Sequence, residues 1–422
     1  MRLGGIIASS AELLNNFFIS KKPVSTLIKE WSVTHRFAGS NDRHKIANII
    51  YDVLRSYNNF KVLAQSDALE EVIFISLLCG QYSIGYSALE FELSTNKYAS
   101  HLLKYLSYCR DLETRAVKTN NAEFNLANIV PWQKKYFIQS FGADWVQEAA
   151  ALCSRAPIDI RVNTLKANIE DLKNRLNIKN IDNFINEALR IEATYRTEKK
   201  HNLLALDEYK KGYFEIQDFG SQIIAKLVGA KEHMQILDYC AGAGGKSLNM
   251  AAHMNNNGRI FAHDKYKYRL APIYERIRKS GASIVRPLNR LCELDLKHNM
   301  DIVVVDAPCS GSGTWRRFPD SKYLLQEHDL LLTIHKQQTI LQQASKYVKN
   351  GGYLCYMTCS LFAAENDKQI EIFINNNAQF NLDKSKIEAI KDISYFTKYG
   401  ILLTPFKSNS DGFYFAALKR ES

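Results

Sequence analysis

The stretch Asp301-Ile-Val-Val-Val-Asp-Ala-Pro-Cys-Ser-Gly-Ser-Gly-Thr314 joins a run of β-branched residues to a loop of small residues. A short apolar run bounded by turn residues predicts a buried parallel strand. Pro308 has no backbone N–H, so we expect the strand to end near it. Ligands of open α/β sheets bind just outside the carboxyl ends of the strands. Asp306 and Cys309 are therefore predicted to lie at the mouth of a site.

A second strand pattern ends in the same way. Gly352-Tyr-Leu-Cys-Tyr-Met-Thr-Cys-Ser360 carries Cys359 at its carboxyl end, and a helical pattern over residues 322–349 precedes it. This order predicts a right-handed βαβ unit. If the two strands are neighbours in the sheet, Cys309 and Cys359 face one crevice. Cys355 points to the opposite face from its immediate neighbours in the strand and is expected in the core.

Length and composition are those of a soluble globular protein. The chain has 422 residues, enough for two or three domains, and is 46% hydrophobic and 23% charged. Its apolar runs are shorter than the roughly 18 residues of a membrane span, and its first residues lack a signal-peptide pattern. The eight cysteines include no Cys-x-x-Cys pair and no zinc spacing. We expect a cytoplasmic protein with free thiols, no membrane anchor and no bound metal.

The net charge of +11 is unevenly distributed. Residues 1–153 hold 16 Lys+Arg against 14 Asp+Glu, so most of the basic excess lies in the remainder of the chain. A basic surface favours a polyanionic partner such as nucleic acid. The charge alone is equally compatible with a soluble protein that happens to be basic.

Residues 1–153 read as a helical domain. Ile46, Ile49, Ile50 and Val53 follow the spacing of an amphipathic helix, and similar patterns recur at 8–18, 23–31, 68–78, 99–106 and 131–141. The sequence of this region indicates no chemical activity, and a scaffold or dimerisation module is an alternative role. Residues 154–216 read as a small α+β module, with a strand at 158–163, a helix at 164–176 and weaker strand signals at 189–191, 203–206 and 213–216. Its basic residues could contact phosphates or form an ordinary solvated surface.

A glycine-rich turn opens the last part of the chain. A strand ends at Asp238, the turn spans Cys240-Ala-Gly-Ala-Gly-Gly-Lys246, and a helix follows, as in the first βα turn of a Rossmann-like sheet. A P-loop is disfavoured because Cys240 stands where its first glycine would be. The next strand, 258–264, ends in Asp264, where an acid usually binds a ribose hydroxyl. These features predict an adenosine-type cofactor. Strands at 283–286 and 301–306 and a closing antiparallel pair at 400–404 and 412–418 complete the predicted sheet.

Two motifs carry a family resemblance. Asp306-Ala-Pro-Cys-Ser-Gly-Ser-Gly-Thr314 and Thr358-Cys-Ser360 closely resemble the RsmB/Sun-type RNA cytosine-5 methyltransferases. Further matches are Asp238–Lys246, Arg161–Thr164, Gln217-Asp218 and Asp411–Phe413. The resemblance covers about 155–422, and the N-terminal region is similar, less closely, to the NusB-like domain of the ribosomal-RNA branch.

The resemblance implies a domain plan: a helical NusB-like RNA-binding domain (1–153), a small α+β RNA-binding module (154–216), and an α/β Rossmann-like methyltransferase domain (217–422) that uses S-adenosylmethionine. The implied reaction is methylation of cytosine carbon 5 in RNA, with small-subunit ribosomal RNA as the substrate. Cys359 is implied as the nucleophile that adds to carbon 6, Asp306 as the group that contacts the base and acts as general acid, and Cys309 as the base for release. A Cys309 thiol with a near-neutral pKa would suit that role.

The resemblance also implies binding residues. Those for the cofactor are Cys240, Ala241, Gly242, Ala243, Gly244, Gly245, Lys246, Asp264, Asn289 and Asp306. The candidates for RNA follow from charge and position: Arg161 lies in the basic α+β module, and Arg316 and Arg317 lie just past the glycine loop, where a solvated turn is the alternative. The chain departs from the family pattern twice: the turn lacks the usual proline at Ala243, and Asn289 stands where an Asp near the adenine is common.

Three other functions were weighed. The same reaction on transfer RNA is the nearest alternative. A non-catalytic RNA-binding assembly factor is opposed by the joint presence of Asp306, Cys309 and Cys359. A DNA cytosine methyltransferase is disfavoured, because those enzymes place their nucleophile in the Pro-Cys turn and have no second cysteine in a Thr-Cys-Ser motif.

Overall fold

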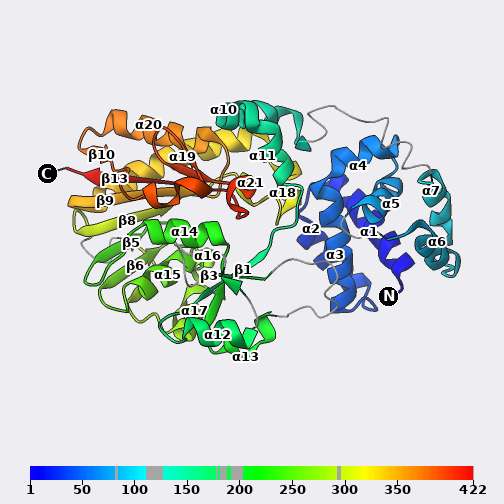
Figure 1. Ribbon diagram of the computed structural model, residues 1–422, viewed down its shortest axis with the longest axis horizontal. Coiled ribbons are helices and arrows are strands. Elements are labelled where there is room, and N and C mark those ends of the chain that lie inside the picture. The colour runs from blue at the N-terminus through cyan, green and yellow to red at the C-terminus, as the bar shows by residue number, and fades with distance from the viewer. Residues whose placement is uncertain are drawn as a thin grey trace. The chain divides into compact units, whose positions relative to one another are not determined.

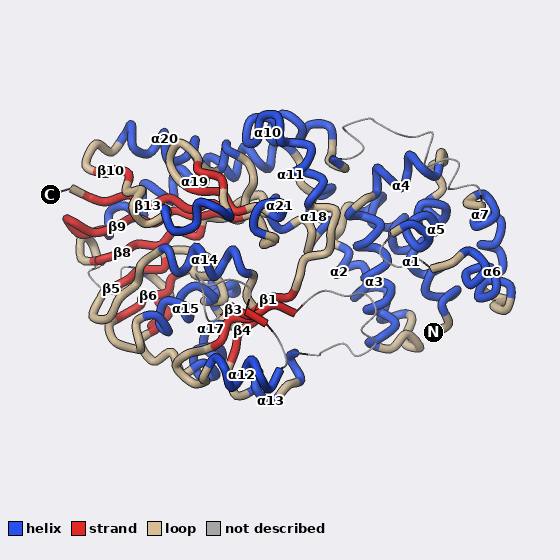
Figure 2. Tube along the Cα trace, viewed as in Figure 1, coloured by secondary structure: helices blue, strands red, loops and turns tan. Residues whose placement is uncertain are grey.

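The computed structural model describes residues 1–80, 84–110, 127–176, 179–180, 188–191, 203–291 and 296–421 (Figures 1 and 2). The chain divides into two compact units. Met1–Arg155 with Trp315–Gln326 form the helical unit, and Ala156–Thr314 with Glu327–Ser422 form the sheet unit. None of the described helices is long and apolar enough to cross a membrane.

The helices of the helical unit up to residue 109 bury their apolar faces in one core. Its N-terminal part comprises α1 (Leu3–Ser20), α2 (Val24–Thr34), α3 (Ser40–Arg55), α4 (Tyr57–Ala64), α5 (Leu69–Cys79), α6 (Tyr86–Ser94), α7 (Leu103–Tyr108), α10 (Lys134–Phe141) and α11 (Trp145–Ala151). The predicted stripe on α3 is confirmed, since Ile46, Ile49, Ile50 and Val53 are all at most 2% exposed. The start of α3 is fixed by the Asp42 carboxylate, which accepts a hydrogen bond from the Gly39 N–H at 3.1 Å.

A short segment from the C-terminal half of the chain completes the helical unit. Helix α18 (Pro319–Leu324) packs on α3. The Asp320 carboxylate accepts a hydrogen bond from the Val24 N–H at 3.0 Å, at the start of α2. The buried Lys322 ammonium donates to the Asn128 carbonyl at 2.7 Å. Residues 217–422, predicted as one continuous domain, are therefore interrupted between Thr314 and Glu327.

The sheet unit begins with a small antiparallel sheet of order β2-β3-β1-β4. Its elements are β1 (Ile158–Val162), α12 (Ile169–Leu176), β2 (Lys179–Asn180), β3 (Ala188–Ile191), α13 (Asp207–Lys210) and β4 (Phe214–Ile216). Helix α12 starts later than predicted because the Asn168 side chain accepts from the Glu170 N–H at 2.9 Å and caps the helix there. The strand predicted at 203–206 is wrong, because Leu203–Ala205 form a 3-10 turn.

The large sheet has the order β11-β12-β13-β9-β8-β5-β6-β7, with β10 paired to β13. Its strands are β5 (Gln235–Asp238), β6 (Arg259–His263), β7 (Val285–Leu288), β8 (Met300–Asp306), β9 (Val348–Thr358), β10 (Phe380–Leu382), β11 (Tyr395–Phe396), β12 (Ile401–Leu403) and β13 (Phe413–Arg420). Strands β5 to β9 run parallel, β13 is antiparallel to β9, and β12 is antiparallel to β13. The predicted closing antiparallel pair is thus confirmed. Pro287 is tolerated in β7 because that strand lies at the edge of the sheet.

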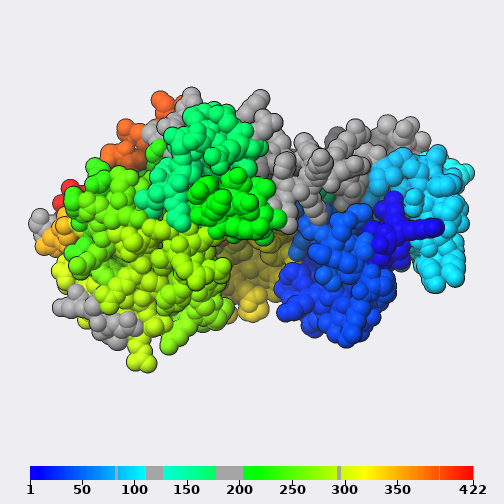
Figure 3. Space-filling model, turned by 90° about the horizontal axis from the view of Figure 1, so that it is seen from below, coloured from blue at the N-terminus to red at the C-terminus, as the bar shows by residue number. Residues whose placement is uncertain are grey.

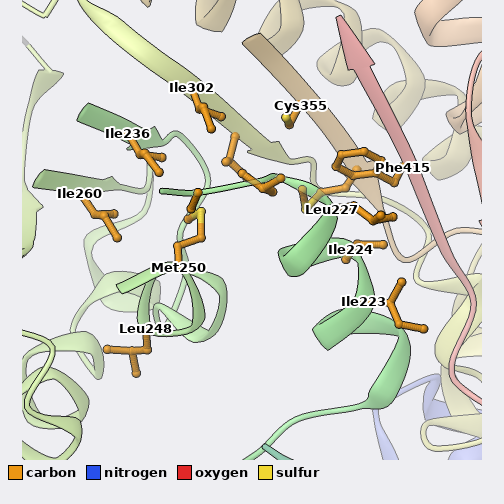
Figure 4. Close-up of a cluster of buried hydrophobic side chains, with 14 of the residues drawn as sticks. Ile223, Ile224, Leu227, Ile236, Leu248, Met250, Ile260, Ile302, Cys355 and Phe415 are labelled. Atoms are coloured by element: carbon orange, nitrogen blue, oxygen red, sulfur yellow. The ribbon is translucent and has the colours of Figure 1, made fainter. Parts of the chain in front are cut away.

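Helices cover both faces of this sheet, as Figure 1 shows. On one face lie α14 (Phe219–Leu227), α15 (Gly245–His253) and α17 (Ile273–Ser280); on the other lie α19 (Glu327–Ala344) and α20 (Asp367–Asn376). Short helices α16 (Lys267–Leu270) and α21 (Pro405–Ser408) complete the unit. Successive side chains of β8 and β9 point to opposite faces of the sheet. Ile302 and the predicted core residue Cys355 point toward α14 and α15, where they join the cluster drawn in Figure 4.

The small sheet is tied to the large one by buried polar contacts. The Asn163 amide donates to the Ser280 carbonyl at 2.8 Å, and the Glu215 carboxylate accepts from Arg276 at 2.9 Å. In Figure 3 the green and yellow-green atoms of this part of the sheet unit form one continuous surface. Residues 156–216 therefore belong to the same compact unit as the large sheet.

Candidate active site

The two cysteines lie together at the carboxyl ends of neighbouring strands. Strands β8 and β9 pair in parallel, with Asp306 opposite Met357. The Sγ atoms of Cys309 and Cys359 are 3.2 Å apart. The Gly313 N–H donates to the Cys359 carbonyl at 3.0 Å and ties the two turns together. The predicted meeting of the two cysteines at the strand ends is present in the structure, and both thiols are free.

The contact between the thiols shifts the pKa of Cys309. The hydrogen bond to Cys359 raises the pKa of Cys309 well above its ordinary value, and burial adds to the rise. The contact therefore favours the protonated form of Cys309. The expected near-neutral pKa of Cys309 is wrong for this state of the site, because that expectation left out the second sulfur.

A lysine and a carboxylate stand beside the thiols. The Lys246 ammonium, from the first turn of α15, donates to Asp306 Oδ2 at 2.6 Å. Burial lowers the pKa of Lys246, but the Asp306 carboxylate outweighs burial and leaves that pKa raised overall. The ammonium also lies 5.6 Å from the centre of the Phe413 ring. Lys246 is thus the proton-bearing member of this ion pair.

The glycine turn between β5 and α15 has the backbone that its composition predicts. Gly242 and Gly244 have φ values of +51° and +80°, which suit glycine. A Cβ on Gly244 would lie 2.4 Å from the Ile273 side chain, so the close packing of α17 also requires glycine there. A Cβ on Gly242 would come no closer than 3.8 Å to any neighbouring atom, so the turn is open on that side.

Asp264 faces this turn from the end of β6. The side chain is buried, and its Oδ2 accepts from the Gly242 N–H at 3.1 Å while its Oδ1 accepts from the Tyr266 N–H at 2.9 Å. A carboxylate has about four acceptor positions, so capacity for hydroxyl donors remains. An open glycine turn beside such an acid fits the nucleoside part of S-adenosylmethionine.

Other predicted cofactor residues lie at the same strand ends. Cys240 and Ala241 follow β5, and the Ala241 N–H donates to the His263 carbonyl at 2.8 Å. Asn289 directly follows β7 and is exposed. The described residues contain no group of three or more His, Cys, Asp or Glu side chains arranged to hold a metal ion.

Two of the three predicted RNA-binding arginines are buried. Arg161 and Arg316 are 2% and 1% exposed, and the Arg161 Nε donates to the Gln217 side chain at 2.8 Å. Because these two guanidinium groups are buried within the protein, the prediction that they bind RNA phosphates is wrong. Arg317 is partly exposed and stays a candidate.

Glu365 has no role predicted from the sequence, and in the structure it contacts both cysteine turns. This fully buried carboxylate accepts from the Ser310 N–H at 2.8 Å and from the Ser360 hydroxyl at 2.5 Å. These serines directly follow Cys309 and Cys359. Burial raises the pKa of Glu365, while the serine hydrogen bonds oppose the rise. The available signal was an acid a few residues after the Thr-Cys-Ser motif.

A second buried carboxylate gives a prediction about pH. Burial raises the pKa of Asp238 to about 7, although the Ser247 hydroxyl donates to it at 2.6 Å. Because the folded pKa lies above the ordinary value of 3.8, this residue's contribution to stability is complete at low pH and is lost as pH rises from about 4 to about 7. The loss corresponds to at most about 4 kcal/mol. Asp238→Asn should flatten this part of the profile, measured by urea unfolding of the full chain at several pH values. Parallel profiles for variant and wild type would contradict this prediction.

Comparisons with known proteins find similarity to ribosomal RNA methyltransferases. Residues 225–419 match the family model described as 16S rRNA methyltransferase RsmB/F. A relative from Coxiella burnetii, named probable ribosomal RNA small subunit methyltransferase B, is 26% identical over 97% of this chain and 98% of its own length. A Bacillus subtilis protein of the same name is 28% identical over 69% of this chain and 66% of its own length.

Solved structures share the fold. The structure of NSun6 from Pyrococcus horikoshii with SFG has a TM-score of 0.60 at 21% identity and covers 69% of this chain and 98% of its own. A methyltransferase homolog protein from the same organism has a TM-score of 0.60 at 23% identity and covers 71% of this chain and 97% of its own.

Proposed function

We propose that this chain, which matches the RsmB/F methyltransferase family model over residues 225–419, uses S-adenosylmethionine to methylate carbon 5 of a cytosine in small-subunit ribosomal RNA. The observation that carries the proposal is the pair of thiols 3.2 Å apart beside the Lys246–Asp306 ion pair. The names of the relatives support ribosomal RNA as the substrate class.

Cytosine carbon 5 needs activation because it is a poor nucleophile. In the proposed reaction the Cys359 sulfur adds to carbon 6 of the ring, which makes carbon 5 electron-rich. The Lys246–Asp306 pair contacts the N3 side of the base and supplies the proton that offsets the charge gained by the ring. S-adenosylmethionine, held by the glycine turn and Asp264, supplies an electrophilic methyl group.

Release requires a base for the proton on carbon 5. Once Cys359 is bonded to carbon 6, its sulfur carries no charge and cannot accept the Cys309 hydrogen bond as before. The largest cause of the raised Cys309 pKa is then removed, so the Cys309 thiol loses its proton more easily at the stage when a base is needed. Cys309 takes the carbon 5 proton, the Cys359 sulfur leaves as thiolate, and the proton given to the base in the first step returns to the Lys246–Asp306 pair.

An exposed surface beside the cofactor turn suits single-stranded RNA. Tyr266 and Tyr268 are 48% and 75% exposed, with ring centres 5.7 Å apart. The exposed Lys265 and Lys267 alternate with them. Aromatic rings stack on bases while cations contact phosphates, so this segment and Arg317 take the place of the two buried arginines in the RNA proposal.

The substrate assay uses the full chain with labelled S-adenosylmethionine and either 16S ribosomal RNA or transfer RNA. We expect label in the ribosomal RNA, recovered after nucleoside digestion as 5-methylcytidine. Label in transfer RNA alone would contradict the ribosomal assignment. Label on another nucleoside would contradict cytosine-5 chemistry, and no label in either RNA would favour a non-catalytic assembly factor.

A further inference from the structure

The two cysteine turns are joined underneath by one side chain. Oε1 of Glu365 accepts from the Ser310 N–H at 2.8 Å, and Oε2 accepts from the Ser310 hydroxyl at 2.5 Å. The same Oε2 accepts from the Ser360 hydroxyl at 2.5 Å. Glu365 thus bonds to the residue after Cys309 and to the residue after Cys359.

The carboxylate is itself held from several directions. Gln337 of α19 donates its amide to Oε1 at 3.0 Å and also donates to the Pro308 carbonyl at 2.9 Å. The Glu365 carbonyl accepts from the Tyr356 hydroxyl at 2.7 Å. A carboxylate offers about four acceptor positions, and here four donor contacts occupy them, two at each oxygen.

A third serine extends the link between the turns. The Ser312 hydroxyl lies 3.2 Å from the Ser310 hydroxyl and 3.2 Å from the Ser360 hydroxyl. It also accepts from the Leu361 N–H at 2.8 Å. Charge-assisted hydrogen bonds of this kind are stronger than neutral ones, and removing the central acceptor leaves several buried donors without a partner.

We propose that Glu365 is the positioning residue of the thiol pair: it sets the distance between Cys309 and Cys359 by holding both of their turns. Glu365 contacts the serines and neither sulfur, so it acts through the backbone. Its importance for methylation rests on the function proposed above. Its effect on the distance between the thiols does not, which allows the two ideas to be tested separately.

The distance can be tested without RNA. Two sulfurs at 3.2 Å need only a small movement to reach the roughly 2.05 Å of a disulfide bond. Diamide oxidises the two thiols to a disulfide and is itself reduced to the hydrazine. The rate of the Cys309–Cys359 cross-link, followed by mass spectrometry of tryptic peptides, therefore reports on thiol placement.

We expect diamide to link Cys309 to Cys359 readily in the wild-type chain and at least tenfold more slowly in Glu365→Ala. Glu365→Gln, which keeps the shape but can accept at only one of its two terminal atoms, should fall between them and covers the case in which the alanine variant does not fold. Asp367→Asn is the matched control. Its carboxylate, two residues away, accepts from the Tyr414 and Thr397 hydroxyls at 2.7 Å and touches neither cysteine turn.

In the methylation assay Glu365→Gln should lower kcat about 100-fold, the scale expected when a reacting group is misplaced by about 1 Å, with unchanged affinity for S-adenosylmethionine. A wild-type cross-linking rate in a folded Glu365→Ala would overturn the proposal. So would an equal loss of cross-linking in Asp367→Asn, since the effect would then be general destabilisation. If wild type does not methylate RNA, the proposed function fails, while the cross-linking result still decides the role of Glu365.

Discussion

Cys309→Ala is expected to accumulate a covalent complex with RNA, while Cys359→Ala is expected to form none and to lose methylation. The two sulfurs are 3.2 Å apart, yet their assigned tasks fall at opposite ends of the reaction. Without Cys359 the ring is not activated, and a loss of at least about 10⁴-fold is expected for removal of a covalent nucleophile. Without Cys309 the methyl group can be transferred, but carbon 5 keeps its proton and the carbon–sulfur bond persists.

Both variants can be compared on one denaturing gel after incubation with labelled ribosomal RNA and S-adenosylmethionine. A slow-migrating RNA–protein band should be present for Cys309→Ala and absent for Cys359→Ala. Cys355→Ala is the matched control, because this thiol is fully buried in the hydrophobic core, and its loss should leave turnover close to that of wild type. Equal bands for the first two variants, or wild-type turnover by Cys309→Ala, would contradict the assigned roles.

Lys246→Met is expected to lower the rate of methylation by about 10²–10⁴-fold, the range of general acid–base catalysis. The Lys246 ammonium lies 2.6 Å from Asp306, and the raised pKa of Lys246 keeps the proton on this pair above neutral pH. Methionine retains the length of the side chain and removes the charge. The Asp306 carboxylate is then left without the partner that supplies its proton. The negative charge that the ring gains when Cys359 adds to it is therefore no longer neutralised.

The measurement is single-turnover methylation, paired with calorimetric titration of S-adenosylmethionine. Lys349→Met provides the control. Lys349 forms an ion pair with Asp301, which lies at the start of β8, whereas Asp306 lies at the end of that strand. That variant should keep the wild-type rate. A Lys246→Met enzyme with an unchanged rate, or one whose whole loss follows weakened cofactor binding, would contradict the proton role.

Much of the sheet could be predicted from local pattern. Asp301–Asp306 and Gly352–Thr358 are apolar runs bounded by turn residues, and such runs specify buried strands with little help from the rest of the chain. Once they were taken as neighbours, the meeting of Cys309 and Cys359 followed from the geometry of parallel strands. Asp264 beside Gly242 followed in the same way from the glycine turn.

The features that were missed depend on partners far away in the sequence. Lys322 and Asp320 look like solvent-facing charges in the sequence, but they are buried against other residues of the helical unit. The residues next to them in the sequence do not indicate this burial. Arg161 and Arg316 were assigned to RNA by charge and position, because a sequence does not reveal that a guanidinium group is buried within the protein. Glu365 lies 55 residues from Ser310, and only the pairing of β8 with β9 brings them together.

The most direct test of the central claim is to identify the amino acid that carries the RNA. The complex trapped with Cys309→Ala would be digested with nuclease and trypsin, and the peptide of residues 350–368 fragmented in a mass spectrometer. The covalent mechanism predicts a methylated cytidine nucleotide on Cys359 and an unmodified Cys355. A nucleotide attached to any other residue, or a complex that carries none, would contradict it.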